Sequence, residues 1–307
     1  MLPLIDWRPR AELQRLRLEW LEQAGVEVGV LRLDQIDQQI SGNKWFKLTE
    51  HLAAAHTAGA QGLISLGGAH SNHLHALAAA GERFGFATVG LLRGHAQQTA
   101  TTLDLERFGM QLHWLGFAGY RARHAPGFWE PWQAQYPALH QVPEGGGGLL
   151  GALGCMTLVT QVREQLSALG WDDYDAWWLA AGTGTTLAGL VLGEAGQRKV
   201  FGALAVPDDH GVAPQVEMIL RQAGATERNL ELIDASRGGF AKVDEALLRF
   251  IQDSEAASGL PLEPLYTGKA LMALKEAVEQ GRIRCGQRIV FVHTGGLQGR
   301  RGLAQAL

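Results

Sequence analysis

A lysine near the start of the chain stands where its amine could do chemistry. Lys44 follows the turn-forming residues 41–43 and precedes two aromatic residues, in the stretch SGNKWFKL. A lysine that is removed from water has a lowered pKa, and its neutral amine can then attack a carbonyl carbon. Lys47, three residues later, is expected to be an ordinary solvated charge, as most lysines are. The role of Lys44 therefore depends on what the rest of the chain brings to the same place.

A glycine- and threonine-rich turn is the second candidate. The stretch AWWLAAGTGTTLAGLVL, residues 176–192, predicts a buried strand, a tight turn and a helix. Backbone N–H groups at such a turn point toward one position, and the helix dipole adds positive potential, so the turn suits a phosphate group. A plain tight turn is the alternative. The candidate phosphate-binding residues are Gly182, Thr183, Gly184, Thr185 and Thr186.

Two well-known nucleotide-binding motifs do not match this turn. A dinucleotide-binding fingerprint would have its third glycine at Leu187, and no acidic partner for a ribose stands out about 20 residues later. A phosphate-binding loop of the GK[ST] type is also missing. A nicotinamide-dependent dehydrogenase is therefore only a remote alternative.

Three further motifs place glycines at predicted helix or strand ends. SLGGAHSNHLHALAAAG, residues 65–81, predicts a helix that begins at Ser71 or Asn72, whose exposed N–H groups could hold a carboxylate. EPLYTGKALMAL (263–274) is a turn that enters a helix, and VFVHTGGLQG (290–299) is a buried strand that ends in glycines. Ligands of parallel sheets bind at such strand ends. Together with Lys44, these motifs describe a pocket for a phosphate and an amine.

The histidines and cysteines do not form a metal motif. His73 and His75 are two residues apart and would diverge on a helix, and His70 adds no regular spacing. Cys155 and Cys285 are 130 positions apart, without the spacing of a zinc site or a disulfide framework. We therefore expect no metal and no disulfide.

Composition favours a small-molecule ligand. The chain has 307 residues, 46% of them hydrophobic, with a formal net charge of −4. This charge gives no electrostatic reason to expect nucleic acid or an anionic membrane as a partner. Charges begin at Asp6, and no long apolar run follows, so neither a signal peptide nor a membrane span is expected. We expect a cytoplasmic protein.

The elements that must position these residues follow a strand and helix alternation. Short apolar runs at 62–66 and 87–92, separated by a helical pattern at 71–85, are typical of a parallel sheet, and the second half repeats the pattern. Residues 120–148 lack a clear period and are expected to be a crossing between domains or a loop over a site. We predict the α/β class, with two domains that each hold a mostly parallel twisted sheet flanked by helices. The predicted domains are 46–150, which is the smaller, and 1–45 plus 151–307.

The motifs in this order resemble the family of 1-aminocyclopropane-1-carboxylate (ACC) deaminases and D-cysteine desulfhydrases. These are fold-type II pyridoxal-phosphate enzymes, similar to the tryptophan synthase β-subunit. The resemblance rests on SGNKWFKL, GGAHSNH, PEGG, AAGTGTTLAGL, YTGKA and HTGGLQG and runs along essentially the whole chain. It implies a smaller and a larger α/β domain with the cofactor between them, and a homodimer.

The resemblance also implies roles for individual residues. Lys44 would form the Schiff base with pyridoxal 5'-phosphate, the turn at 182–186 would hold its phosphate, and Asn72 would contact its ring oxygen. Such a lysine is a competent imine former, and the cofactor supplies the electron sink.

On the substrate side, the resemblance implies a small amino acid. Ser71 and the backbone amides of Asn72 and His73 would receive its carboxylate, and Tyr266 would stand beside the cofactor near it. Ser71 and Tyr266 join Lys44 as the catalytic candidates.

Two threonines decide between the two activities of the family. ACC deaminases carry Glu where this chain has Thr267, and Leu where it has Thr294; both positions are expected to contact the cofactor. A hydroxyl cannot keep the pyridine nitrogen protonated as a carboxylate can, so loss of a β-thiolate should be easier than ring opening. We therefore expect D-cysteine desulfhydrase-like β-elimination, in which Lys44 takes the α-proton and the products are pyruvate, ammonia and sulfide. The alternatives are ACC deaminase, giving 2-oxobutanoate and ammonia, and a non-catalytic pyridoxal-phosphate-binding protein.

Departures from the family lie on the substrate side. Phe240 stands where many relatives have a second active-site tyrosine, and it cannot donate a proton. His70 replaces a glutamine before Ser71. These changes leave the cofactor assignment intact and bear on the choice of substrate.

Overall fold

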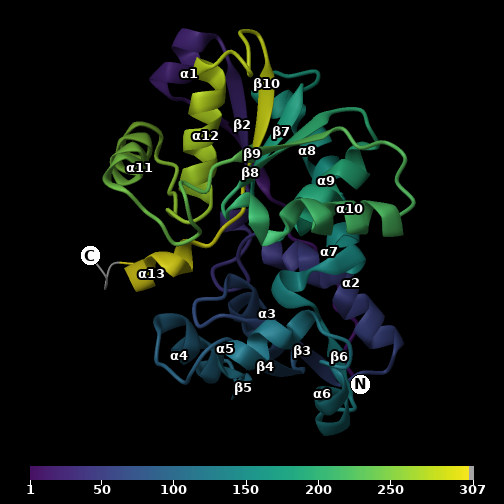
Figure 1. The fold of residues 1–307 in the computed structure, drawn as a ribbon. Helices are drawn as coiled ribbons and strands as arrows, with labels where there is room; N and C mark the ends of the chain where they lie inside the picture. The colour runs from purple at the N-terminus through teal and green to yellow at the C-terminus, as the bar shows by residue number, and fades with distance from the viewer. Residues whose placement is uncertain (304–307) are drawn as a thin grey trace.

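The computed structural model describes residues 1–303, which form two twisted sheets with helices on both faces of each (Figure 1). The predicted α/β class is thereby confirmed. In Figure 1 the larger sheet lies in the upper half of the view and the smaller sheet in the lower half.

The larger sheet has six strands drawn from both ends of the chain. In spatial order they are β1 (Glu12–Leu16), β2 (Glu27–Arg32), β10 (Arg288–His293), β7 (Ala176–Ala181), β8 (Lys199–Leu204) and β9 (Leu230–Asp234). Only β1 is antiparallel to its neighbour. Alternate residues of β7 face opposite cores, with Trp177 on one side and Trp178 on the other. Such two-sided burial accounts for the continuous apolar run AWWLAA.

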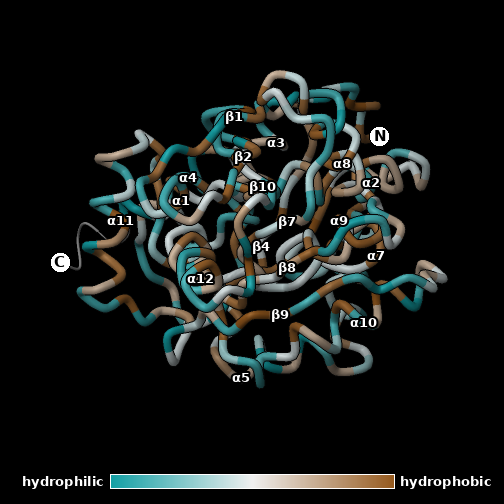
Figure 2. Tube along the Cα trace, turned by 90° about the horizontal axis from the view of Figure 1, so that it is seen from above, coloured by the Kyte–Doolittle hydropathy of each residue, from teal (hydrophilic) through white to brown (hydrophobic). Residues whose placement is uncertain are grey.

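Helices of the larger unit cover these two faces. One core packs under α7 (Gly148–Cys155), α8 (Thr157–Arg163), α9 (Thr185–Glu194) and α10 (Val212–Gln222). The other packs under α1 (Glu19–Ala24), α11 (Glu245–Ser258) and α12 (Thr267–Glu279). Seen from above, β10, β7 and β8 run through the middle of the molecule, with these helices around them (Figure 2).

The smaller sheet has four parallel strands. In spatial order they are β5 (Gln111–Trp114), β4 (Ala87–Leu92), β3 (Gly62–Gly67) and β6 (Leu139–Gln141). Helices α2 (Asn43–Thr57), α3 (Asn72–Phe84) and α4 (Ala100–Arg107) contribute to the core on one face, and α5 (Gly116–Arg121) and α6 (Glu130–Gln135) lie by the other. All four strands lie inside the predicted unit 46–150; the domain boundaries themselves stay a prediction.

The segment 120–148 contains more structure than its sequence suggested. It includes α6 and the strand β6, which pairs with β3 at the edge of the smaller sheet. A strand of three half-buried residues is too short to show an alternating pattern, which is why the sequence did not reveal it.

Helix α2 joins the two units. Trp45 and Leu48 pack into the core of the smaller sheet, whereas Phe46 packs into a core of the larger sheet. Gly154 of α7 lies so close to α2 that a Cβ there would overlap the carbonyl oxygen of Phe46. The absence of a side chain at Gly154 thus allows the backbones of α7 and α2 to approach each other near the start of α2. Among the helices of residues 1–303, none is long and apolar enough to cross a membrane.

We expect Gly154→Ala to destabilise the protein by about 1–3 kcal/mol, because an added methyl group forces α2 and α7 apart. The free energy of unfolding in urea measures this. Gly119→Ala is the matched control: Gly119 is also helical, and an added Cβ would meet only Leu115, at an ordinary 3.4 Å. An equal effect of the two substitutions would contradict the proposed close packing.

Candidate functional site

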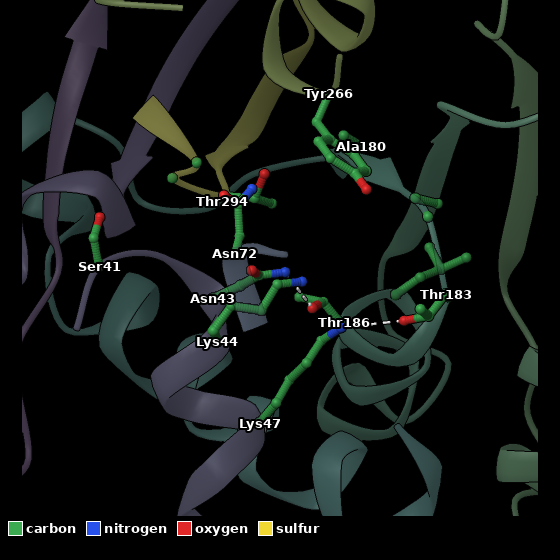
Figure 3. A pocket seen from close by; sticks show the side chains of 16 residues that line it. Ser41, Asn43, Lys44, Lys47, Asn72, Ala180, Thr183, Thr186, Tyr266 and Thr294 are labelled. Atoms are coloured by element: carbon green, nitrogen blue, oxygen red, sulfur yellow. Dashed lines mark hydrogen bonds between the residues drawn. The ribbon is translucent and has the colours of Figure 1, made fainter. Parts of the chain in front are cut away.

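A cleft lies where the carboxyl ends of β7 and β10 meet the starts of four helices. Its lining comes from the starts of α2, α3 and α9, from Tyr266 before α12, and from Thr294 to Gly296 after β10 (Figure 3). Parallel strands leave unsatisfied backbone groups and loops at this edge, so ligands of α/β proteins bind there. The cleft contains Lys44, Asn72, Tyr266, Thr294 and most of the 182–186 turn, which are far apart in the sequence.

Lys44 lies on the first turn of α2, half-buried, and lines the cleft. Burial lowers the pKa of its amine. Lys44 is thus partly removed from water, as a neutral amine that attacks a carbonyl carbon requires.

Lys47 is not the solvated charge expected from the sequence, and that prediction was wrong. Its side chain is only 3% exposed and lines the same cleft, where its Nζ donates a hydrogen bond to Thr183 Oγ1 at 3.2 Å (Figure 3). Burial, together with the charge of Lys44, lowers the pKa of Lys47 well below its ordinary value. Residues three apart share one helix face, so the spacing of the two lysines was the signal that could have revealed this.

The 182–186 turn forms an anion cradle at the start of α9. Gly184 takes a left-handed conformation with φ of 74°, and no side chain caps the helix after it. Thr183 Oγ1 lies 3.1 Å from Thr185 Oγ1. Thr186 Oγ1 accepts a hydrogen bond of 2.8 Å from Asn43 Nδ2, which ties the starts of α9 and α2 together. The uncapped N–H groups and the hydroxyls are donors that suit a phosphate.

The charge balance of the cleft favours an anionic ligand. Within residues 1–303 no carboxylate forms an ion pair with Lys44 or Lys47. Two adjacent buried amines without a counter-charge are unfavourable, and a dianion against the open end of α9 would relieve this. A Cβ on Gly182 would lie 3.0 Å from Cε1 of Tyr266. The absence of a side chain at this position therefore leaves room beside the Tyr266 ring. The site fits a ligand that carries both a phosphate and a group reactive toward an amine.

At the start of α3 the predicted residues have different surroundings. Ser71 is the N-cap, and its Oγ accepts a hydrogen bond from the Leu74 N–H at 3.2 Å. Asn72 lines the cleft, and its Oδ1 accepts a bond of 3.1 Å from Gln298 Nε2, a partner that the sequence did not suggest. The imidazole of His73 is buried, with Nε2 2.7 Å from Ser65 Oγ. Burial and the charges of Lys44 and Lys47 lower the pKa of His73 well below its ordinary value.

Tyr266 and the two threonines occupy the opposite wall. Tyr266 lines the cleft, and burial, assisted by the charge of Glu263, raises the pKa of its phenol. Thr294 also lines the cleft, and its carbonyl accepts a 3.1 Å bond from the Asn43 N–H. Thr267 is fully buried behind the lining, where its Oγ1 accepts a 2.9 Å bond from the N–H of Glu263.

Glu263 is a buried carboxylate that the sequence analysis did not single out. It accepts hydrogen bonds from the backbone N–H groups of Leu265, Tyr266 and Thr267 at 2.8, 2.8 and 2.6 Å. Burial raises its pKa, and these bonds oppose the rise. The carboxylate thus accepts hydrogen bonds from the otherwise unpaired N–H groups at the start of α12 and holds the backbone at Tyr266 in place.

Comparison with known proteins agrees with this site. A family model described as pyridoxal-phosphate dependent enzyme matches residues 11–295. A putative ACC deaminase of Pyrococcus furiosus is 28% identical over 286 residues, which cover 90% of this chain and 86% of that protein. A D-cysteine desulfhydrase of Klebsiella pneumoniae is 27% identical over 310 residues, covering 94% of each chain. The crystal structure of an ACC deaminase homologue, 26% identical, superposes with a TM-score of 0.83 over 99% of this chain and 94% of that one.

We expect Lys47→Met to weaken the binding of inorganic phosphate to the cofactor-free protein by about 10-fold or more, since a charged hydrogen bond to an anion is lost. Calorimetric titration measures the affinity. Lys242→Met removes an exposed lysine and serves as the control for net charge. Equal affinities of the two variants would show that Lys47 does not contact the anion.

The lowered pKa of Lys47 also predicts a pH effect on stability. Between this lowered value and the ordinary pKa of 10.5, the unfolded chain binds a proton that the folded chain has released, so stability rises with pH. We expect the unfolding temperature of cofactor-free wild type, relative to that of Lys47→Met, to rise from about pH 7 to about pH 9.5. Parallel pH profiles of the two proteins would contradict the prediction.

Proposed function

Because the chain belongs to the pyridoxal-phosphate dependent enzyme family, we propose that it is a lyase that eliminates a β-thiolate from a small amino acid, as a D-cysteine desulfhydrase does. The observation that carries the proposal is the pair of buried amines, Lys44 and Lys47, that faces the anion cradle of the 182–186 turn. The family match also removes the support for a nicotinamide-dependent dehydrogenase.

The residues of the cleft divide into those that hold the cofactor and those that handle the proton. In this proposal Lys47 and the 182–186 turn bind the phosphate and Lys44 forms the covalent link, which their common place in the cleft supports. Asn72, whose Oδ1 is occupied by Gln298, has its Nδ2 left to donate to a ring oxygen. When bound, pyridoxal phosphate stabilises the negative charge that forms at the α-carbon of an amino acid.

Lys44 is the proposed general base. Its lowered pKa increases the neutral fraction near neutral pH, which an ordinary lysine almost lacks. The start of α3, with the backbone amides of Asn72 and His73, is the proposed site for the substrate carboxylate. Ser71 is proposed to assist there, because its hydroxyl proton stays available when its oxygen accepts the cap bond. The phenol of Tyr266 stays protonated, since its pKa is raised, and is a hydrogen-bond donor on the substrate side.

Two features support elimination rather than ring opening. Thr267, at the position that by resemblance carries the partner of the pyridine nitrogen, is buried behind the lining, and its oxygen accepts a hydrogen bond from the Glu263 N–H. Thr294 likewise adds a hydroxyl and no charge to the lining. Neither side chain can keep the ring nitrogen protonated as a carboxylate would, so the electron sink is weaker and a good leaving group is favoured.

The test begins with absorption spectra of the wild type and of Lys44→Ala, both supplied with pyridoxal phosphate. We expect a visible band near that of a lysine-linked cofactor in the wild type and its loss in the variant, because Lys47, the other amine of the cleft, is held by its hydrogen bond to Thr183 Oγ1. Lys242→Ala is the control and should keep the band. Matching spectra of wild type and Lys44→Ala would overturn the cofactor assignment.

Product analysis then decides the substrate. We expect pyruvate and sulfide from D-cysteine at a rate at least about 10-fold above that of 2-oxobutanoate from ACC, a difference that corresponds to about 1.4 kcal/mol in barrier. L-cysteine is tested beside it to fix the stereochemistry. Faster formation of 2-oxobutanoate would instead make the protein an ACC deaminase. A yellow protein that turns over none of these amino acids would support a binding role without catalysis.

A further inference from the structure

A buried lysine outside the cofactor cradle has no role in the function proposed above. Lys269, the lysine of the YTGK motif, lies in the first turn of α12 and is 1% exposed. Its Nζ donates three hydrogen bonds, to the carbonyl oxygens of Ser236, Gly239 and Phe240, at 2.9, 2.8 and 3.0 Å. It forms no ion pair with a carboxylate within the described part of the chain. All three donors of an ammonium group are thus used on a single backbone loop.

Besides Lys269, ion pairs of Arg237 with Asp244 and Glu276 and a hydrogen bond from the Ser236 N–H to Asp234 hold that loop, residues 236–240. It lies between β9 and α11 and contains two glycines. The backbone of Arg237 has a φ of 55°, a value that residues other than glycine rarely adopt. Two backbone hydrogen bonds of 3.2 Å also involve the loop, from the Gly239 N–H to the Ser236 carbonyl and from the Lys242 N–H to the Gly239 carbonyl. Burying an ammonium group is unfavourable unless its hydrogen bonds are made, so Lys269 and the loop stabilise each other.

The loop carries an aromatic residue that packs on Tyr266 of the cleft lining. The ring of Phe240 lies 5.4 Å from that of Tyr266, at an interplanar angle of 62°. Tyr266 lines the cleft, and Lys269 follows it by three residues, so both lie on one side of the start of α12. The loop and the start of α12 therefore meet twice: Lys269 holds the loop, and Phe240 of the loop packs on the ring of Tyr266.

We propose that Lys269 is a positioning residue for the substrate side of the active site, acting through the 236–240 loop and Phe240 on Tyr266. The proposal rests on the proposed function for the place of Tyr266 beside the substrate. Within residues 1–303 the phenol of Tyr266 forms no hydrogen bond that would orient it, so its orientation depends on the packing of Phe240. The cofactor cradle is formed by α2 and α9 and does not involve these residues. Loss of Lys269 should consequently weaken substrate binding and leave cofactor binding unchanged.

Limited proteolysis measures directly how often the 236–240 loop opens. Trypsin cleaves after Arg237 and Lys242, which lie in and beside the loop. We expect Lys269→Met to accelerate cleavage at these two bonds by about 10-fold or more, since local opening loses three hydrogen bonds from a charged donor. Lys275→Met is the matched control on the same helix, because Lys275 pairs at the surface with Glu279, and it should leave the cleavage rate unchanged. Unchanged cleavage in Lys269→Met would overturn the proposal.

Kinetics and cofactor titration test the link to the site. In Lys269→Met we expect the KM for the amino acid to rise by about 10-fold, while the affinity for pyridoxal phosphate stays within about twofold. Phe240→Ala keeps the lysine anchor, so it should raise KM in the same way without faster cleavage, and it serves if Lys269→Met does not fold. An unchanged KM in Phe240→Ala, or a loss of cofactor affinity equal to the loss of substrate affinity, would refute the positioning role.

The outcome is separable from that of the proposed function. Proteolysis and cofactor titration need no substrate, and KM can be replaced by the spectral change of the cofactor-loaded protein on addition of D- and L-amino acids. If D-cysteine is not a substrate and the loop of Lys269→Met is still cleaved faster, the proposed elimination fails while the anchoring of the loop holds. If D-cysteine is a substrate and the loop is unaffected, only the positioning role fails.

Discussion

Two buried amines without a counter-charge are the constraint on which the rest of this structure depends. Lys44 and Lys47 lie one turn apart on α2, both with lowered pKa values, and the nearest complement is the open start of α9. Burial of such groups costs free energy in the absence of an anion. An anion that binds here relieves this cost, which strengthens the binding of a phosphate-bearing cofactor. The cofactor-free protein is therefore less stable, and its affinity for the cofactor is higher, than if these two amines were solvated.

The fold meets this constraint by close backbone packing. Gly154 lets α7 contact the backbone of α2, and Gly189 does the same for α9 against α7, so three helices converge at distances that a side chain would prevent. Asn43 and Lys47 then bind the threonines of the 182–186 turn across that contact. Glycine, which makes up 40 of the 307 residues, serves here for helix packing as much as for turns.

Much of the architecture could be predicted, because its signals are local. The strand β7 coincides with the run AWWLAA, and β3 and β4 lie within a residue of their predicted bounds. The site residues Lys44, Asn72, Tyr266 and Thr294 were found through short motifs, and the cleft brings them together. Short or half-buried elements such as β6 were missed, since three residues carry too little periodicity.

The sequence by itself determined which residue types stand at helix and strand ends, and hence the α/β class, the candidate phosphate turn and the candidate nucleophilic lysine. Only the tertiary structure decided which polar side chains are buried and what they bind. In that structure Lys47 is buried and bonded to Thr183, Thr267 accepts a hydrogen bond from the Glu263 N–H, and Lys269 is bonded to the 236–240 loop. The physical reason is that the burial and the hydrogen-bond partners of a side chain depend on segments that are distant in the sequence. Lys47 and its partner Thr183 are more than 100 residues apart, and no local pattern encodes such a contact.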